Sequence, residues 1–532
     1  MYKLKLFSGA SGLWWRRALI IMVVILYGWT FQKTFQNTEK CTPLWGYSSE
    51  SIYAAISELK YGAKPFHTYQ RVKEVMWNSV ADSVAQRRGR NECGPDVSSI
   101  NQGINRALEL KDLGAEIYVH TSLLGTELPG YALLCKIGFY FFGFKFESIF
   151  YAYWLLLMLP ALILLISFHN KNSVLYVLFL YTIALSAILQ TQGFLEEGVL
   201  RARHFVMLTI LPVFHLALVM ANAQNKQRWF IYFGAAIQAL ILSWAVFTRP
   251  AGLYQFLYLL AITVVFFVYY IRKKRWRALI KVAYPIILIL VCYGSLRTYG
   301  SPPVNSNSLT SASSLTSRGC IWHPFLLGLG AHPDATLKHG LAWSDTAVID
   351  IIEKRAPEYG LVWQGVFTDF AHEKNVIVQC SKEYETILKD EYFRIFRQDP
   401  WFVISAYFYG VIEYFRLYFS QLRPGEWAAY HNFGLWDVIN RETLILISLG
   451  IAILFRMTSV PKITLQPLGL FVIGFLFAIP IPVLVYPVNH AIADSSVYLT
   501  VFLFAVFVEA GVIALQMFVQ ILAGIFMRKD KI

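Results

Sequence analysis

Residues 147–168, ESIFYAYWLLLMLPALILLISF, contain one charged residue, Glu147, at their first position. After a short polar break, residues 173–191, SVLYVLFLYTIALSAILQT, form a second apolar run that has no charge at all. A helix needs about 20 mainly apolar residues to cross a bilayer, and both runs have about that length. The two runs therefore predict a pair of membrane-spanning helices joined by a short turn.

Further apolar segments repeat this pattern along the chain. Of its 532 residues, 56% are hydrophobic and only 15% are charged. A soluble domain of this size cannot hide that much apolar surface in one core. We therefore expect an all-α polytopic membrane protein with about ten spans. The segments lie at roughly 18–31, 147–168, 173–191, 205–222, 229–247, 252–271, 278–296, 443–456, 464–487 and 496–526.

Basic residues set the expected orientation, because cytoplasmic loops carry an excess of Lys and Arg. Ten spans with both termini inside place six basic clusters in the cytoplasm: Arg16 with Arg17, Lys171, Lys226 with Arg228, residues 272–277, Arg456 with Lys462, and Arg528 with Lys529. The chain then divides into an N-terminal transmembrane module (1–296), an outer loop (297–442) and C-terminal transmembrane helices (443–532). A first outer loop, 32–146, lies within the N-terminal module.

Segment 401–420, WFVISAYFYGVIEYFRLYFS, is apolar but is not expected to span. A span here would move Arg456 and Lys462 to the outside, and Glu413 and Arg416 interrupt the segment. Aromatic side chains favour the headgroup layer of a bilayer. We therefore expect an interfacial helix along the outer surface.

The formal net charge of +14 does not indicate nucleic-acid binding, because no basic domain stands free of the membrane. Positive cytoplasmic loops and an outer surface facing anionic lipid phosphates account for it. The basic N-terminus and first apolar run resemble a signal peptide, but no small-residue cleavage site follows Trp29, so we expect a retained anchor. The chain has no Asn-x-Ser/Thr sequon, which favours a multi-pass protein of a bacterial inner membrane.

The cysteines fall into two groups. Two in each outer loop are compatible with the disulfides Cys41–Cys93 and Cys320–Cys380 in an oxidising compartment, or with buried thiols. The other two, Cys135 and Cys292, lie in apolar surroundings and are expected to be free.

A short helix is expected in the first outer loop, in residues 45–66, WGYSSESIYAAISELKYGAKPF. Ser48 and Ser49 can cap its start, and Gly62 is expected to end it. Glu50 would then lie at the mouth of an amphipathic helix close to the membrane. Its carboxylate can act as a general base at the lipid edge, or it can only stabilise the helix N-terminus.

This stretch resembles the first-loop helix of the GT-C superfamily, in the acidic residue, the Tyr53 that follows it, and the Gly-x-x-Pro at 62–65. Pro129-Gly130-Tyr131 with its apolar helix, and Arg249-Pro-Ala-Gly252, resemble later segments of the same superfamily. Its members are multi-spanning glycosyltransferases that use polyprenyl-phosphate sugars. The resemblance implies that Glu50 is the catalytic base, although the paired-acid form of the motif is absent, since residues 48 and 49 are serines.

Cationic residues in two connections point outward in this topology, against the usual trend. Arg201, Arg203 and His204 follow the third span, and Arg249 follows the fifth. Arg offers paired donors to phosphate oxygens, so these residues are expected to bind the donor phosphate. Arg203 can equally pair with Glu196 or Glu197 across its own loop.

Polar residues gather again in the outer loops. Those expected to contact sugar or acceptor are Glu127, His323, His332, Trp343 and Asp345. Trp can stack on a sugar ring and Asp can accept from its hydroxyls. His323, His332 and His339 could instead bind a divalent metal, but their spacing matches no compact metal motif.

These features favour an integral membrane glycosyltransferase. It would transfer a sugar from a polyprenyl-phosphate donor to a glycan, lipid or protein acceptor at the outer face. An enzyme like the O-antigen polymerases or ligases, which use lipid diphosphates, is the first alternative. A transporter or flippase would place ionisable residues inside its spans, and the spans here are nearly free of charge.

Overall fold

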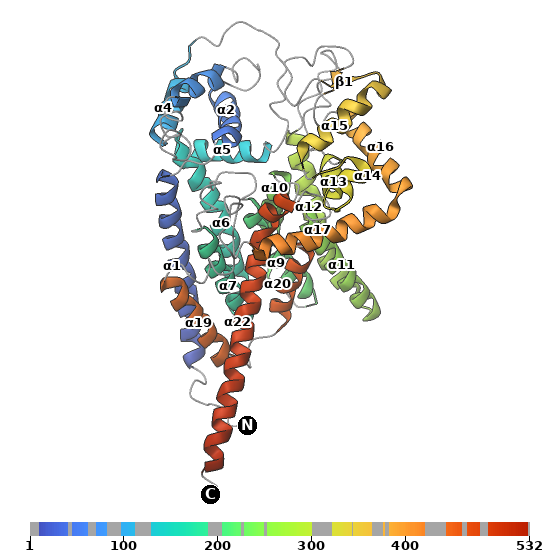
Figure 1. Ribbon diagram of the computed structural model, residues 1–532. Helices are drawn as coiled ribbons and strands as arrows, with labels where there is room; N and C mark the ends of the chain where they lie inside the picture. The colour runs from blue at the N-terminus through green and yellow to red at the C-terminus, as the bar shows by residue number, and fades with distance from the viewer. Residues whose placement is uncertain are drawn as a thin grey trace.

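The described part of the protein is almost entirely helical (Figure 1). The computed structural model describes residues 10–40, 45–61, 71–81, 97–111, 129–189, 205–224, 228–248, 253–300, 322–342, 344–363, 376–377, 382–420, 443–459, 465–478 and 488–529. Within these ranges the only strands are β1 (Val362–Trp363) and β2 (Val376–Ile377), which pair in parallel.

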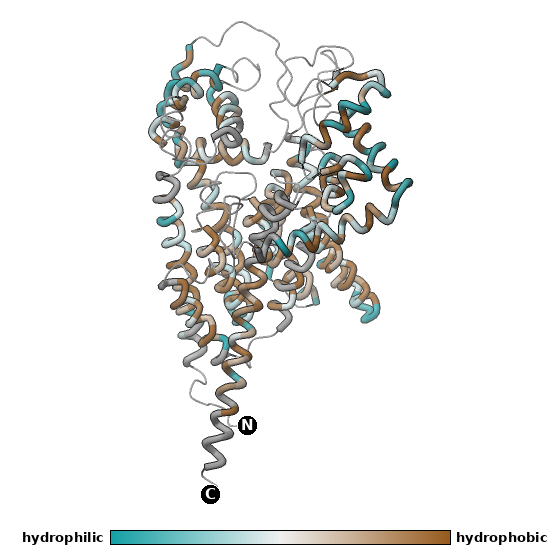
Figure 2. Tube along the Cα trace, in the orientation of Figure 1, coloured by the Kyte–Doolittle hydropathy of each residue, from teal (hydrophilic) through white to brown (hydrophobic). Residues whose placement is uncertain are grey.

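Seven of the described helices are long and apolar enough to cross a membrane. This confirms the expected all-α class with multiple apolar helices, and Figure 2 shows hydrophobic residues dominating the bundle that they form. The seven are α1 (Ala10–Lys40), α6 (Phe146–Phe168), α7 (Asn172–Leu189), α10 (Trp229–Thr248), α11 (Tyr254–Arg272), α12 (Trp276–Gly300) and α22 (Val488–Lys529).

The expected count of about ten spans is not confirmed. Three further apolar helices match expected spans but are shorter: α9 (Met207–Ala221), α19 (Thr443–Ser459) and α20 (Leu465–Ala478), with 15, 17 and 14 residues. At about 1.5 Å per residue each reaches only ~21–26 Å, less than the ~30 Å hydrocarbon core. Helices α19 and α20 also adjoin residues outside the described ranges.

Polar contacts gather the connections between spans at one end of the bundle. Arg16 Nε donates to Asn172 Oδ1 at 2.6 Å, which joins the start of α1 to the start of α7. Lys171 Nζ donates to Asn222 Oδ1 at 2.7 Å, and Arg275 bonds to the same turn after α9. Three of the basic residues expected on the cytoplasmic side, Arg16, Lys171 and Arg275, therefore take part in contacts between neighbouring connections.

Helix α7 lies at the centre of the bundle. All eighteen of its residues are buried, as expected for a helix that is apolar on every side. Helices α1, α19, α20 and α22 pack around it. Thr30 Oγ1 of α1 donates to Ser186 Oγ at 2.7 Å, so polar pairing adds to the apolar packing.

The first outer part consists of α2 (Trp45–Tyr61), a helix over 71–81, α4 (Val97–Leu108) and α5 (Pro129–Phe142). Its buried residues, such as Met76 and Ile104, join the same hydrophobic core as the spans. Asn101 Oδ1 accepts from the backbone N–H of Phe146 at 2.8 Å and ties α4 to the start of α6. This outer part is therefore anchored directly on the bundle.

The second outer part has its own hydrophobic core, which includes Leu326, Ile352 and Leu388. Glu391 is buried and accepts from two arginines, Arg355 and Arg394, so its charge is paired. The elements are α13 (Trp322–Leu329), α14 (Ala335–His339), α15 (Asp345–Arg355), the 3-10 turn η5 (Ala356–Tyr359), the β1–β2 pair, α16 (Lys382–Gln398) and α17 (Pro400–Ser420).

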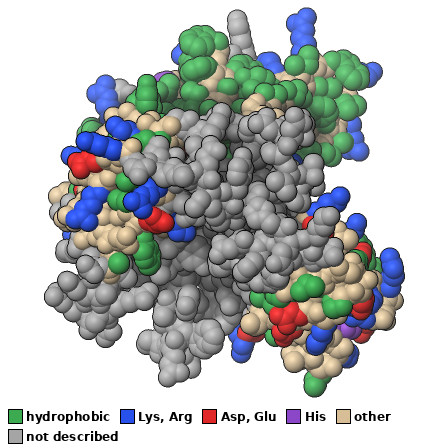
Figure 3. All heavy atoms as spheres, turned by 90° about the horizontal axis from the view of Figure 1, so that it is seen from above, with side chains coloured by type: hydrophobic (Ala, Val, Ile, Leu, Met, Phe, Trp, Pro, Cys, Tyr) green, Lys and Arg blue, Asp and Glu red, His purple; other side chains and the backbone are tan. Residues whose placement is uncertain are grey.

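Seen from above, side chains of both charges gather on two outer areas, whereas hydrophobic side chains dominate a third edge (Figure 3). Helix α17 runs across the long axis of the spanning helices (Figure 1). It is not among the described helices that meet the criteria for spanning a membrane. Cys135 and Cys292 are free, as expected, whereas the four outer cysteines lie outside the described residues.

Candidate functional site

The Pro129-Gly130-Tyr131 motif contacts the end of α10, directly before the predicted Arg249 stretch. Trp244 Nε1 of α10 donates to the backbone oxygen of Gly130, at the start of α5, at 2.8 Å. A Cβ atom on Gly130 would lie 1.9 Å from Thr248 Oγ1 and 2.9 Å from Thr248 Cα. Only glycine permits this approach, so the Pro-Gly-Tyr motif is the point at which α5 rests on the end of α10.

Tyr131, the residue after Gly130, contacts Phe205, which directly follows the connection that carries Arg201, Arg203 and His204. The ring of Tyr131 lies 6.2 Å from the ring of Phe205, in an edge-to-face arrangement. Phe205 in turn lies 6.3 Å from Trp244. We call Gly130, Tyr131, Phe205, Trp244 and Thr248 the outer junction.

The outer junction flanks both predicted phosphate-binding stretches. Phe205 directly follows His204, and Thr248 directly precedes Arg249. Arg201, Arg203, His204 and Arg249 themselves lie outside the described residues, so their role in phosphate binding stays a prediction. Their chain neighbours Phe205 and Thr248 both belong to the outer junction, so one end of each connection lies there.

Helix α2 brings Glu50 into the same outer part, because α2 packs on α5. An ion pair between Lys136 of α5 and Glu58 of α2 supports this packing. Glu50 lies in α2, but its side chain is not described, and Glu127 lies outside the described residues. The role of Glu50 as the base therefore stays a prediction.

The expected start of this helix is wrong. Helix α2 begins at Trp45, and Ser49 is buried within it instead of capping its end. Glu50 therefore lies beyond the first turn, where the favourable effect of the helix dipole on a carboxylate has largely faded. The explanation of Glu50 as an N-terminal stabiliser loses support. The expected end is confirmed, since α2 stops at Tyr61, immediately before Gly62.

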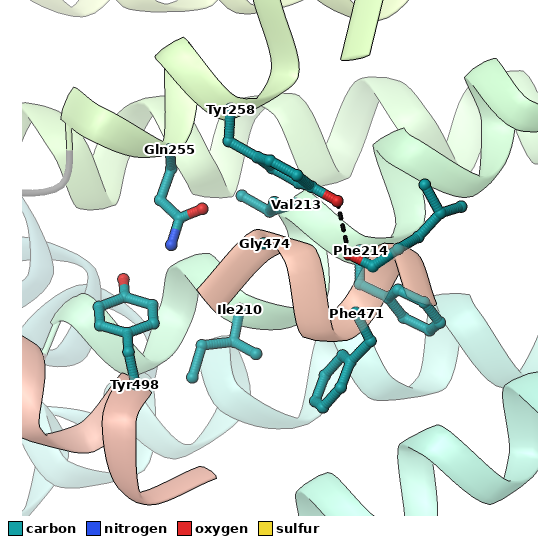
Figure 4. Close-up of a pocket in the computed structure, with 9 residues that line it drawn as sticks. Ile210, Val213, Phe214, Gln255, Tyr258, Phe471, Gly474 and Tyr498 are labelled. Atoms are coloured by element: carbon teal, nitrogen blue, oxygen red, sulfur yellow. Dashed lines mark hydrogen bonds between the residues drawn. The ribbon is translucent and has the colours of Figure 1, made fainter. Parts of the chain in front are cut away.

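A small pocket lies between α9, α11, α20 and α22 (Figure 4). Its volume of about 20 Å³ has room for about one water molecule. Gln255 is 3% exposed, and its Oε1 atom has no hydrogen-bond partner among the described residues. In Figure 4 its amide points toward Tyr498, across a space otherwise lined mainly by apolar groups.

Hydrogen bonds hold the tyrosines of this pocket in place. Tyr258 Oη donates to the Leu470 carbonyl oxygen at 2.5 Å, and the Tyr258 ring approaches the position that a Cβ on Gly474 would take to 3.3 Å. Tyr498 Oη bonds to Thr209 and lies 3.2 Å from the Val206 carbonyl oxygen. Because Val206 follows Phe205 directly, the pocket lies next to the outer junction. The side-chain amide of Gln255 is the buried polar group that lines it beside the tyrosines.

The second outer part buries the predicted histidines to different degrees. His323 is 6% exposed, and its Nδ1 lies 2.5 Å from Tyr384 Oη, inside the core of this part. His332 and His339 lie 4.7 and 4.4 Å from the Phe402 ring, measured between ring centroids. The Asp334 backbone N–H donates to His332 Nδ1 at 3.0 Å. All three imidazoles therefore take part in packing.

The other predicted residues of this part remain untested. Trp343 lies outside the described residues, and Asp345 begins α15 with a side chain that is not described. Among the described residues, no group of three or more His, Cys, Asp or Glu side chains could hold a metal ion.

Burial lowers the pKa of His339 below its usual value, although the Asp399 charge opposes this. The charges of Arg394 and Lys338 act in the same direction as burial. The neutral imidazole is therefore favoured in the folded protein.

Sequence reasoning missed a buried polar cluster in the spans. Arg456 Nε lies 3.2 Å from both carboxylate oxygens of Glu509, and Tyr176 Oη donates to Glu509 Oε1 at 2.7 Å. The cluster joins α7, α19 and α22. An acidic residue in an otherwise apolar segment was the available signal, because such a charge needs a partner.

Comparison with known proteins gives no relative: no family model, no curated protein and no solved structure matches this chain.

Proposed function

We propose that this protein is an integral membrane glycosyltransferase that works at the outer face. The sugar would come from a polyprenyl-phosphate donor embedded in the lipid. The observation that supports this most is the outer junction, where Gly130 and Tyr131 contact the residues flanking both arginine-bearing connections. Two of the segments that resemble the superfamily, at 129–131 and 249–252, thus adjoin one place in the fold, together with the connection that carries Arg201 and Arg203.

In this proposal Glu50 accepts the proton of the acceptor hydroxyl. The acceptor oxygen then bonds to the anomeric carbon of the sugar, and the bond from that carbon to the phosphate oxygen breaks. The leaving group is a polyprenyl phosphate, whose negative charge Arg201, Arg203 and Arg249 would stabilise, with His204 beside them. The packing of α2 on α5 supports the assignment of Glu50, because α5 begins at the outer junction.

The second outer part would contribute contacts to sugar or acceptor. Glu127 in the first outer loop, and Trp343 and Asp345 here, remain candidates, as do His323 and His332, whose imidazoles also take part in packing. The partners would be the lipid-linked donor, an acceptor glycan, lipid or protein, and the surrounding membrane lipids.

A donor screen tests the proposal. The purified protein in lipid nanodiscs is incubated with radiolabelled polyprenyl-phosphate sugars, and with lipid diphosphate sugars as the alternative class. Glu50→Gln keeps the shape of the side chain and removes the base. Transfer should therefore fall by about 10²-fold or more, the usual contribution of a general base. Donor binding should survive.

Glu58→Gln is the matched control, because it makes the same change on the same helix, at a carboxylate already engaged with Lys136. It should retain most of the activity. Full activity in the Glu50 variant would place the base elsewhere, and transfer only from lipid diphosphates would favour the polymerase or ligase class. No transfer from any donor would contradict the proposed function.

One observation favours a transporter instead, namely the ion pair between Arg456 and Glu509 within the spans. The pair is closed on itself, since both oxygens of Glu509 face Arg456 and one also accepts from Tyr176. An ion pair that is already satisfied stabilises helix packing more readily than it binds a substrate. The glycosyltransferase therefore remains the better-supported function.

A further inference from the structure

Helix α17 exposes a continuous apolar strip. Trp401, Phe408 and Ile412 are 73%, 67% and 62% exposed, and Ile404 between them is 40% exposed. Steps of three and four residues place these four side chains on one face of a helix. We call them the α17 strip. No charged residue interrupts it, since the next charges, Glu413 and Arg416, follow its end and pair with each other.

The opposite face of the same helix is fully buried. Phe402, Val403 and Ala406 belong to the core of the second outer part, and the rings of His332 and His339 pack against Phe402. Helix α17 therefore covers the core of this part with one face and leaves the α17 strip uncovered by the described residues.

The position of α17 identifies what covers the strip. The helix crosses the long axis of the spans, and it packs against the spanning helix α22 (Figure 1). It therefore lies at the edge of the bundle, where the outer part meets the membrane. The lipid-facing sides of neighbouring spans are also apolar and exposed, for example Leu260 and Val264 of α11.

Helix α5 is a second transverse helix with exposed aromatic side chains, and it lies higher along the bundle than α17 in Figure 1. It also crosses the long axis of the spans (Figure 1), and it ends with Tyr140 and Phe141, which are 75% and 69% exposed. Aromatic side chains are enriched where a membrane meets water. The two helices therefore share a transverse direction and exposed aromatic residues, and α17 is the one that packs against the spanning helix α22.

We propose that the α17 strip lies in the headgroup layer of the outer leaflet and supports the second outer part on the lipid surface. The sequence predicted an interfacial helix here. The structure adds that the α17 strip is its exposed face and that the core of the second outer part packs against the opposite face. The inference does not depend on the proposed enzymatic function. Its partner is lipid, because the strip is aromatic and aliphatic, lacks charge, and lies at the edge of an apolar bundle.

Depth-dependent quenching tests this proposal on the full chain. Phe408→Cys is labelled with an environment-sensitive fluorophore, and the protein is reconstituted in vesicles of phosphatidylethanolamine and phosphatidylglycerol. One quencher is a phosphatidylcholine spin-labelled near the headgroup, and the other is iodide in water. Labelling of the unaltered chain measures the background from its own thiols.

Val362→Cys is the matched control, because Val362 is a 59% exposed apolar residue of the same outer part and lies in β1, well away from α17 in Figure 1. The label at 408 should be quenched severalfold more by the spin-labelled lipid than the label at 362, and severalfold less by iodide. Ile412→Cys replaces the first variant if that variant does not fold.

Two results would overturn the proposal. Equal quenching of both labels by iodide would show that the strip faces water. Protection of the strip label from both quenchers would show that protein covers it, either a second copy or another part of the chain.

Discussion

Replacement of Gly130 by alanine should separate α5 from α10. The new Cβ atom would lie 1.9 Å from Thr248 Oγ1, 2.8 Å from its Cβ and 2.9 Å from its Cα. A rotamer change can move the hydroxyl oxygen but cannot move the backbone atom. The helices must therefore shift, which also lengthens the bond from Trp244 Nε1 to the Gly130 oxygen.

The magnitude follows from known costs of overpacking. An extra carbon in a well-packed contact costs about 1–3 kcal/mol. The entropy of unfolding is about 2.1 cal/mol/K per residue, which for 532 residues gives a fall in melting temperature of about 1–3 °C. The transfer rate at a temperature where the variant is still folded should also fall, because the proposed donor-phosphate site adjoins the outer junction.

The assay is thermal unfolding in detergent, followed by tryptophan fluorescence. Thr248→Ala in the same chain removes the 1.9 Å contact with the hydroxyl oxygen but leaves the contacts of 2.8 and 2.9 Å with Cβ and Cα, so the double variant should recover only part of the loss. Gly294→Ala is the control, because a Cβ atom there meets nothing within 4 Å. Unchanged melting of the Gly130 variant, or no recovery in the double variant, would refute this account of the junction.

Two further predictions concern charged groups. Glu509→Gln leaves Arg456 without its counter-ion, and removal of one partner from a buried ion pair typically costs about 3–5 kcal/mol, so melting should occur several degrees lower. Joint replacement of Arg456 by Met should restore part of the loss, and additive losses would contradict a direct pair. Burial holds the pKa of His339 in the folded protein below the usual imidazole value of about 6.5, so its stabilising effect is complete above about pH 6.5 and is lost as the pH falls below it. The protection factors of residues 382–398, which compare each measured hydrogen-exchange rate with the intrinsic rate at the same pH, should therefore fall between pH 7.5 and 5. The fall should be smaller in His339→Gln, and an equal fall in both proteins would contradict this role.

The broad architecture was predictable because the bilayer imposes a length and a polarity on each segment. Residues 147–168 and 173–191 predict α6 and α7 almost to the residue, since a membrane-spanning helix must be apolar throughout. The count of ten spans could not be confirmed, because α9, α19 and α20 are shorter than the bilayer core within the described residues. Helix starts were harder to predict, as the difference between Ser48 and Trp45 shows, because capping preferences are weak beside tertiary packing.

The candidate site divides in the same way. From the sequence alone it follows that Glu50, Arg201, Arg203, His204 and Arg249 belong to connections on one expected side of a membrane, because charge and hydropathy act locally along the chain. The packed structure was needed to show that Gly130 permits the contact with Thr248, and that Tyr176, Arg456 and Glu509 meet. These contacts join residues far apart in sequence, so they depend on which helices pack together, and no local pattern encodes that choice.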